Sequence, residues 1–170
     1  MALTTDYHTV WPIKVVSEAN RRDHHFVKSK RVASQRLAVR CFWLDELGPK
    51  FRATLPVIVT LTRHAGRTLD TGDNLPGSFK AVRDELAALL LPKETIVIYK
   101  RGRRIETTKQ PDDADPRLCF IYHQEKHRGP SHISVHILSA SEEQVSIMRN
   151  PTALLGLVRA TYPCRSAAGY

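Results

Sequence analysis

Apolar positions along the chain follow several spacings, and each spacing predicts a different element. The run from Thr54 to Thr62 is apolar and β-branched over strand length, which is typical of a buried strand with Pro56 near its start or on an edge. Between Pro76 and Pro92 apolar residues recur every three to four positions, which predicts an amphipathic helix that packs on a sheet. The apolar side of that helix carries Phe79, Val82, Leu86, Leu89 and Leu90.

Two further patterns extend this picture on either side. Residues 17–47 contain no Gly or Pro and are expected to be mainly helical. Residues 94–105 resemble a hairpin around Gly102. Residues 117–124 and 133–138 predict two strands that pair antiparallel across the turn 127–131, and the alternation in the second implies one buried face. Ser141 opens a possible final helix.

The net charge of the chain indicates what kind of partner it could bind. The 170 residues include 26 Lys and Arg against 17 Asp and Glu, a net charge of +9, which favours polyanions and above all nucleic acid. A merely basic protein is the alternative. No apolar run approaches the ~20 residues of a membrane span, no secretory signal is recognised, and three widely spaced cysteines favour reduced thiols. We therefore expect a cytoplasmic protein, with no membrane partner.

Cations gather in the first part of the helical segment, where few acids neutralise them. They are Arg21, Arg22, Lys28, Lys30, Arg31, Arg36 and Arg40. Phosphate contact is one interpretation, and a solvated helix face is the other. The tip of the expected hairpin, which includes Arg101, Arg103 and Arg104, has the same two interpretations.

Acids follow the buried strand and precede the strand at 117. Asp70 and Asp73 would supply one side of a Mg²⁺ site, and Asp113 with Asp115 the other, because carboxylates suit this hard cation. Lys80 would neutralise charge developing on a phosphate. The alternatives are ordinary turn chemistry, helix capping by Asp or Asn, and an exposed Lys80–Asp84 ion pair.

The order of these residues resembles the RusA-like Holliday-junction resolvases of phages and prophages. The resemblance lies in "R-x-L-D-x-x-D-N-L" at 67–75, "K-A-V-R-D" at 80–84, "D-D-x-D" at 112–115 and "Q-x-K" at 124–126, with "SEANRR" at 17–22. It implies a small mixed sheet flanked by helices, an α/β (α+β) homodimer, and Mg²⁺ or Mn²⁺ held by acidic residues. Metal-binding roles fall on Asp70, Asp73 and Asp113, and a catalytic or phosphate-binding role on Lys80.

This chain departs from the family pattern at one point that bears on the metal. Thr71 and Gly72 both separate Asp70 from Asp73, where the family usually has one residue. Residues 92–111 are then an insertion in a nuclease domain spanning 1–140, and 141–170 form a helical extension and tail. The residues expected to bind DNA are Asn20, Arg21, Arg22, Lys28, Arg31, Arg101, Arg103, Arg104 and Lys126.

The sequence thus predicts a metal-dependent endodeoxyribonuclease that cuts four-way or other branched DNA in a bacterial cell. A symmetric junction needs paired incisions, which favours a twofold dimer with two equal sites. Two rivals remain open: a non-catalytic DNA-binding module with the same fold, and an adaptor whose basic face binds an acidic protein.

Overall fold

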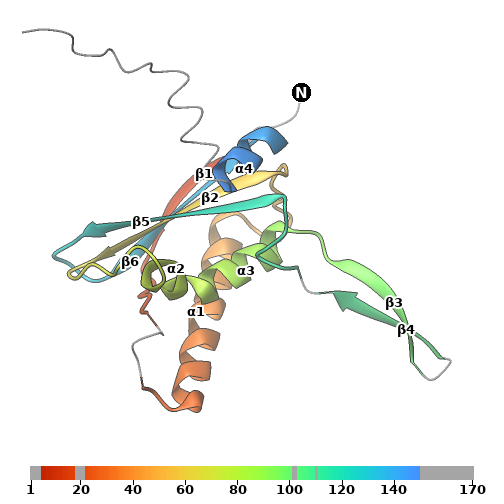
Figure 1. Ribbon diagram of the computed structural model, residues 1–170, viewed down its shortest axis with the longest axis horizontal. Helices are drawn as coiled ribbons and strands as arrows, with labels where there is room; N and C mark the ends of the chain where they lie inside the picture. The colour runs from red at the N-terminus through yellow and green to blue at the C-terminus, as the bar shows by residue number, and fades with distance from the viewer. Residues whose placement is uncertain (1–4, 18–21, 101–102, 110, 150–170) are drawn as a thin grey trace, which may run out of the picture.

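The structure is a computed structural model that describes residues 5–17, 22–100, 103–109 and 111–149 (Figure 1). Four strands form a mixed sheet in the order β1-β6-β2-β5, and two others form a separate hairpin. The elements are β1 Asp6–Trp11, α1 His25–Glu46, β2 Val57–Ala65, α2 Asn74–Ser78, α3 Lys80–Leu90, β3 Glu94–Lys100, β4 Arg103–Lys109, β5 Leu118–Lys126, β6 His132–Ser139 and α4 Glu142–Arg149. The predicted mixed α and β fold, with its hairpin, is confirmed.

The central strand is β2, and its position corrects one prediction. β5 pairs parallel to β2 and β6 pairs antiparallel to it, so β5 and β6 do not pair with each other. The connection between them passes the end of β2, where His127 N donates to Ala65 O at 3.1 Å. The side chains of Val57, Val59 and Leu61 on β2 are inaccessible to solvent. A strand buried to this extent is stable between two neighbouring strands, so β2 lies between β5 and β6 although only a short turn separates those two in sequence.

Helices cover the sheet unequally (Figure 1). The apolar side of α3 joins one core with α1 and the sheet, in which Val82 and Leu86 pack with Val59 and Trp43, as predicted. Val145 of α4 belongs to a smaller cluster with Ile58 and Cys119. Its helix begins with a capping box, because Ser141 and Gln144 each bond the other's backbone N–H. None of the described helices is both long and apolar enough to cross a bilayer.

The start of the chain differs from expectation. The helix expected at 17–47 begins at His25, and β1, which the pattern did not reveal, precedes it. Residues 12–17 follow β1 outside any helix, and Ile13, Val15 and Ser17 are buried at alternate positions. Burial of every second residue is typical of an extended segment, which packs on the core here, and the helix begins only after it.

Candidate functional site

Three carboxylates and a lysine surround a cavity of about 410 Å³ beside the first turns of α3. We call Asp84, Asp112 and Asp113 the acid cluster; Lys80 lies next to it, and all four line this cavity. α3 supplies Lys80 and Asp84 one turn apart, and their charged atoms lie 3.3 Å from each other. The loop before β5 supplies the other two acids.

Asp112 and Asp113 are adjacent in the sequence, and each carboxyl group affects the pKa of the other. Burial raises the pKa of Asp113, and the contact with Asp112 raises it further, while Arg83 and Lys80 act in the opposite direction. The Ala114 N–H, which donates to Asp112 Oδ1 at 3.1 Å, lowers the pKa of Asp112. As the pH falls, Asp113 therefore takes up a proton before Asp112 does.

Arg83 connects this cluster to the sheet. Its Nη1 donates to the Tyr122 hydroxyl at 3.0 Å, and its Nε is in ion-pair contact with Asp113 Oδ2 without the alignment of a hydrogen bond. Burial opposes the charge on Arg83, but Tyr122 and Asp113 together raise the pKa of this guanidinium. Arg83 thus holds Asp113 at a fixed position relative to β5.

The turn after β2 uses its first acid for its own structure. Asp70 Oδ1 accepts from Gly72 N at 2.9 Å, and Asp70 Oδ2 accepts from the Asn74 amide. Asn74 Oδ1 in turn accepts from Ser17 Oγ at 2.5 Å, which ties this turn to the chain before α1. The turn-chemistry interpretation therefore describes Asp70.

Asp73 is different. It is the N-cap residue of α2, yet its side chain makes no capping hydrogen bond and is exposed. Its backbone O accepts from Gly77 N at 3.0 Å, so the main chain alone fixes its place. Helix capping does not account for this carboxylate, which remains free to bind a ligand.

Gln124 positions the turn from the neighbouring strand. Its Oε1 accepts from Leu69 N at 2.8 Å and its Nε2 donates to Leu69 O at 2.6 Å. Both backbone polar groups of Leu69 are thus held by one side chain of β5, directly before Asp70. The "Q-x-K" resemblance falls on this residue.

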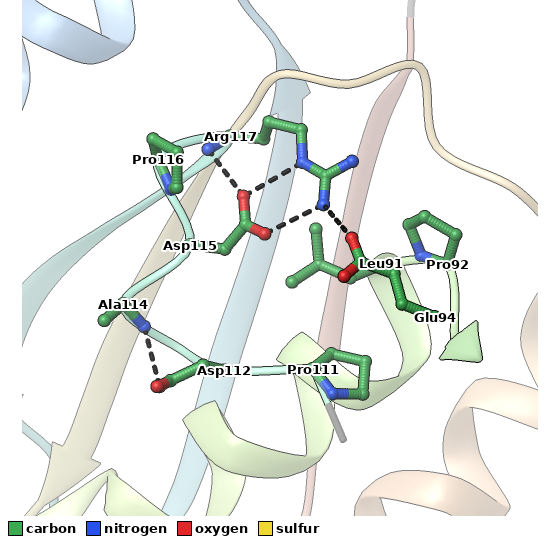
Figure 2. Close-up of a pocket in the computed structure, with 9 residues that line it drawn as sticks. All are labelled: Leu91, Pro92, Glu94, Pro111, Asp112, Ala114, Asp115, Pro116 and Arg117. Carbon is green, nitrogen blue, oxygen red and sulfur yellow. Dashed lines mark hydrogen bonds and ion pairs between the residues drawn. The ribbon is translucent and has the colours of Figure 1, made fainter. Parts of the chain in front are cut away.

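The other predicted ligand, Asp115, turns away from the cavity. Both of its oxygens bond the Arg117 side chain, at 3.0 and 2.8 Å (Figure 2), and this hydrogen bonding lowers the pKa of Asp115. Among the described residues, no group of three or more His, Cys, Asp or Glu side chains is close enough together to hold a metal ion.

Two of the α1 cations form ion pairs with a buried acid of α3. Arg36 Nε and Arg40 Nε each donate at 2.9 Å to Glu85, whose side chain is only 1% exposed. Both guanidinium groups are thus tied to the α1–α3 interface, although Arg36 and Arg40 stay 42% and 56% exposed and Arg36 also lines the cavity beside the acid cluster. Arg31 is half-buried and bonds Asp23 at 2.8 Å.

The exposed residues among the cations predicted to bind DNA lie at three places in the described structure. Arg22 and Lys28 lie at the start of α1, Lys126 at the end of β5, and Arg103 and Arg104 on the hairpin, where Arg104 bonds Glu106 at 2.7 Å. Asn20, Arg21, Arg101 and the predicted tail at 150–170 lie outside the described residues.

Sequence reasoning missed three residues of the site. Asp84 was considered only as an exposed partner of Lys80, Asp112 was passed over in favour of Asp113 and Asp115, and Arg83 was not considered. The spacing Lys80-x-x-x-Asp84 on one helix face was the available signal for the first. The contact of Arg83 with Asp113 and Tyr122 joins segments far apart in the sequence, which no local pattern reveals.

Comparison with models of known protein families gives no match, and no curated protein matches the chain. The resolvase resemblance therefore rests on the motifs quoted above.

Proposed function

We propose that the protein is a metal-dependent nuclease that hydrolyses phosphodiesters in branched DNA, with its active site at the acid cluster. The observation that carries this proposal is that Asp84, Asp112 and Asp113 line one cavity together with Lys80. Two carboxylates held together repel each other when both are charged. A divalent cation between them would remove that repulsion.

The residues present suit Mg²⁺ or Mn²⁺. Mg²⁺ is usually bound through one or two carboxylates, with water and substrate phosphate completing its shell, so Asp112 and Asp113 suffice without a third acid. Asp84 faces the same cavity, and the free Asp73 is the candidate from the other motif. The bound ion would supply a nucleophilic hydroxide and stabilise the departing oxygen.

The remaining side chains have roles that follow from their positions. Lys80 is exposed beside the acids and would pair with a non-bridging phosphate oxygen as negative charge develops there. Arg83 orients Asp113 through its contacts with Asp113 and Tyr122. The exposed Arg22, Lys28 and Lys126 would bind the DNA backbone, whose phosphates carry no sequence information.

A non-catalytic DNA-binding module is the second candidate, and one observation favours it. Asp70 is occupied by hydrogen bonds from Gly72 and Asn74, so the first acid of the motif has a structural use that needs no metal. Such a module would keep the cations and lack cleavage.

The test uses the full chain with a labelled four-way junction and a linear duplex of the same arm sequences, each with Mg²⁺, Mn²⁺ or chelator. The proposal expects junction cleavage that requires the metal and exceeds duplex cleavage. Junction binding without cleavage in either metal would identify the non-catalytic module. If the protein neither binds nor cleaves either DNA, both candidates are overturned and the adaptor interpretation is left.

A further inference from the structure

The β3–β4 hairpin projects away from the sheet and the helices (Figure 1). We call residues 94–109 the arm. Its apolar side chains are exposed: Ile96, Val97, Ile98 and Ile105 by 38 to 42%, and Tyr99 by 75%. An isolated two-stranded hairpin is marginally stable in water, and a third strand adds stability. The arm therefore presents apolar surface that suits a further strand.

The two outer edges of the arm are not equivalent. β4 carries Arg103, Arg104, Glu106 and Lys109, and charges on an edge strand oppose pairing with another chain. β3 has five uncharged residues in succession, 95–99, between one acid and one base. Neither edge pairs with another strand among the described residues. β3 is thus the edge that accepts a partner.

β3 is complementary to itself. Its sequence is ETIVIYK, and antiparallel pairing of two copies about Val97 places Val97 opposite Val97, Ile96 opposite Ile98 and Thr95 opposite Tyr99. The same register places Glu94 opposite Lys100 at both ends. Apolar, aromatic and opposite-charge pairs across strands are the ones that stabilise a sheet.

The equivalent pairing of β4 is unfavourable. About its central residue, Glu106 would face Glu106, and Arg103 would face Lys109. Like charges directly opposite each other destabilise a strand pair. The residue pattern therefore selects one edge and one register.

A second complementarity supports the same partner. In that register the tip of each arm lies beside the root of the other. The root borders a pocket lined by the acids Glu94, Asp112 and Asp115, with Arg117 as its cation (Figure 2). The tip carries the exposed Arg103 and Arg104. Opposite charges would thus meet at both ends of the joined arms.

We propose that the arm is a dimerisation element, in which β3 pairs antiparallel with β3 of a second copy about a twofold axis at Val97 to give a four-stranded sheet β4-β3-β3-β4. The inference rests on the proposed function only in one respect: it gives an interface to the twofold dimer that a junction-cleaving enzyme is expected to form. Because the arrangement is isologous, it closes at two copies and does not extend into filaments. The tip cations then contact the second copy, and DNA is bound elsewhere.

The first test is sedimentation of the full chain over a concentration series, without DNA or metal. Wild type should form a reversible dimer. Glu94→Lys places like charges at both ends of the ladder and should weaken the dimer by about tenfold or more. Glu106→Lys changes the charge of the same arm equally, on the other strand, and should leave the dimer intact.

The double variant Glu94→Lys with Lys100→Glu restores opposite charges across the ladder and should recover the dimer. It does not restore the 3.8 Å contact of Glu94 with Arg117, so recovery separates pairing from a local effect at the root and from a folding defect. A monomer at all concentrations, equal weakening by both single variants, or no recovery would overturn the proposal.

The second test fixes the register. Opposed residues in antiparallel strands have Cα atoms about 4.5 to 5.5 Å apart, within the range of a disulfide. Val97→Cys, with Cys41 and Cys164 replaced by Ser, should form a reducible dimer on mild oxidation, and Glu106→Cys in the same background should not. Cross-linking at 106 alone, or higher oligomers, would contradict the twofold β3 pairing. Neither test depends on cleavage, so a failed nuclease assay leaves both results interpretable.

Discussion

Two acids that are neighbours in the sequence, Asp84 and Glu85, lie in opposite environments on α3. Glu85 faces α1, is buried, and is held by Arg36 and Arg40. Asp84 is 28% exposed and faces the cavity that Asp112 and Asp113 also line. The buried carboxylate has its charge neutralised within the fold, whereas the acid cluster concentrates like charges at a surface. A fold needs the first arrangement for stability, and the second is useful only if a ligand binds.

The largest effect on stability is expected from Glu85. Glu85→Ala removes the buried hydrogen-bond partner of two guanidinium groups and should lower the free energy of unfolding by about 1.5–3 kcal/mol, measured by chemical denaturation. Glu125→Ala is the matched control, because its side chain is 67% exposed. If Glu85→Ala lowers the free energy of unfolding by less than about 1 kcal/mol, the range of surface ion pairs, then Glu85 contributes no more to stability than an exposed acid such as Asp84 would.

The two acids of the β2–α2 turn should separate activity from stability. Asp73→Asn removes an exposed charge with no structural bond, and should reduce junction cleavage by less than Asp113→Asn does, while the melting temperature stays unchanged. Asp70→Asn replaces the carboxylate oxygen that accepts from the Asn74 amide by an amide group. This weakens the hydrogen bond and should cost about 1 kcal/mol of stability in addition. Cleavage assays and denaturation on both variants measure this, and a stability loss confined to Asp73→Asn would contradict the assigned contacts.

The pH dependence of cleavage should follow Asp113. A metal binds the ionised carboxylate, and the pKa of Asp113 is raised by burial and by Asp112, so activity should disappear as the pH falls through a value above the ordinary 3.8. Asp112→Asn removes the neighbouring carboxyl and should move the acid limb of the profile to lower pH, whatever its effect on rate. A limb that does not move would show that another group controls it.

The smallest effect is expected from single phosphate contacts. Lys28→Ala should reduce the slope of log affinity against log salt by about 0.9 on duplex DNA, measured by fluorescence anisotropy without metal. Lys50→Ala removes the same charge beyond the other end of α1 and serves as the control. Equal slopes for Lys28→Ala and wild type would place the DNA away from the start of α1.

Local sequence patterns predict where helices and strands lie better than they predict which of them pair or pack together. The apolar spacing of Val82 and Leu86 and the β-branched run of β2 contain enough information to place a helix and a strand, because burial dictates both. The pairing of β5 with β2 and the extended, buried Ile13–Ser17 depend on which surfaces remain to be covered, which is a property of the whole fold.

The candidate site shows the same limit. Asp113 and Lys80 stand out in the sequence because acids and a helix lysine suit phosphate chemistry. Their proximity to Asp112 and Asp84, and the use of Asp70 in its own turn, follow from side-chain contacts. The sequence does not indicate that Arg36 and Arg40 pair with Glu85, because Glu85 lies more than forty residues away in sequence.

The most direct measurement of the central claim is the rate of junction cleavage in Mg²⁺ by wild type and Asp113→Asn, with Asp45→Asn, an exposed acid near the end of α1, as the control. We expect cleavage by wild type and the control, and a rate at least about a hundredfold lower for Asp113→Asn with unchanged metal-free DNA binding. Cleavage by Asp113→Asn at the wild-type rate would contradict an active site at the acid cluster.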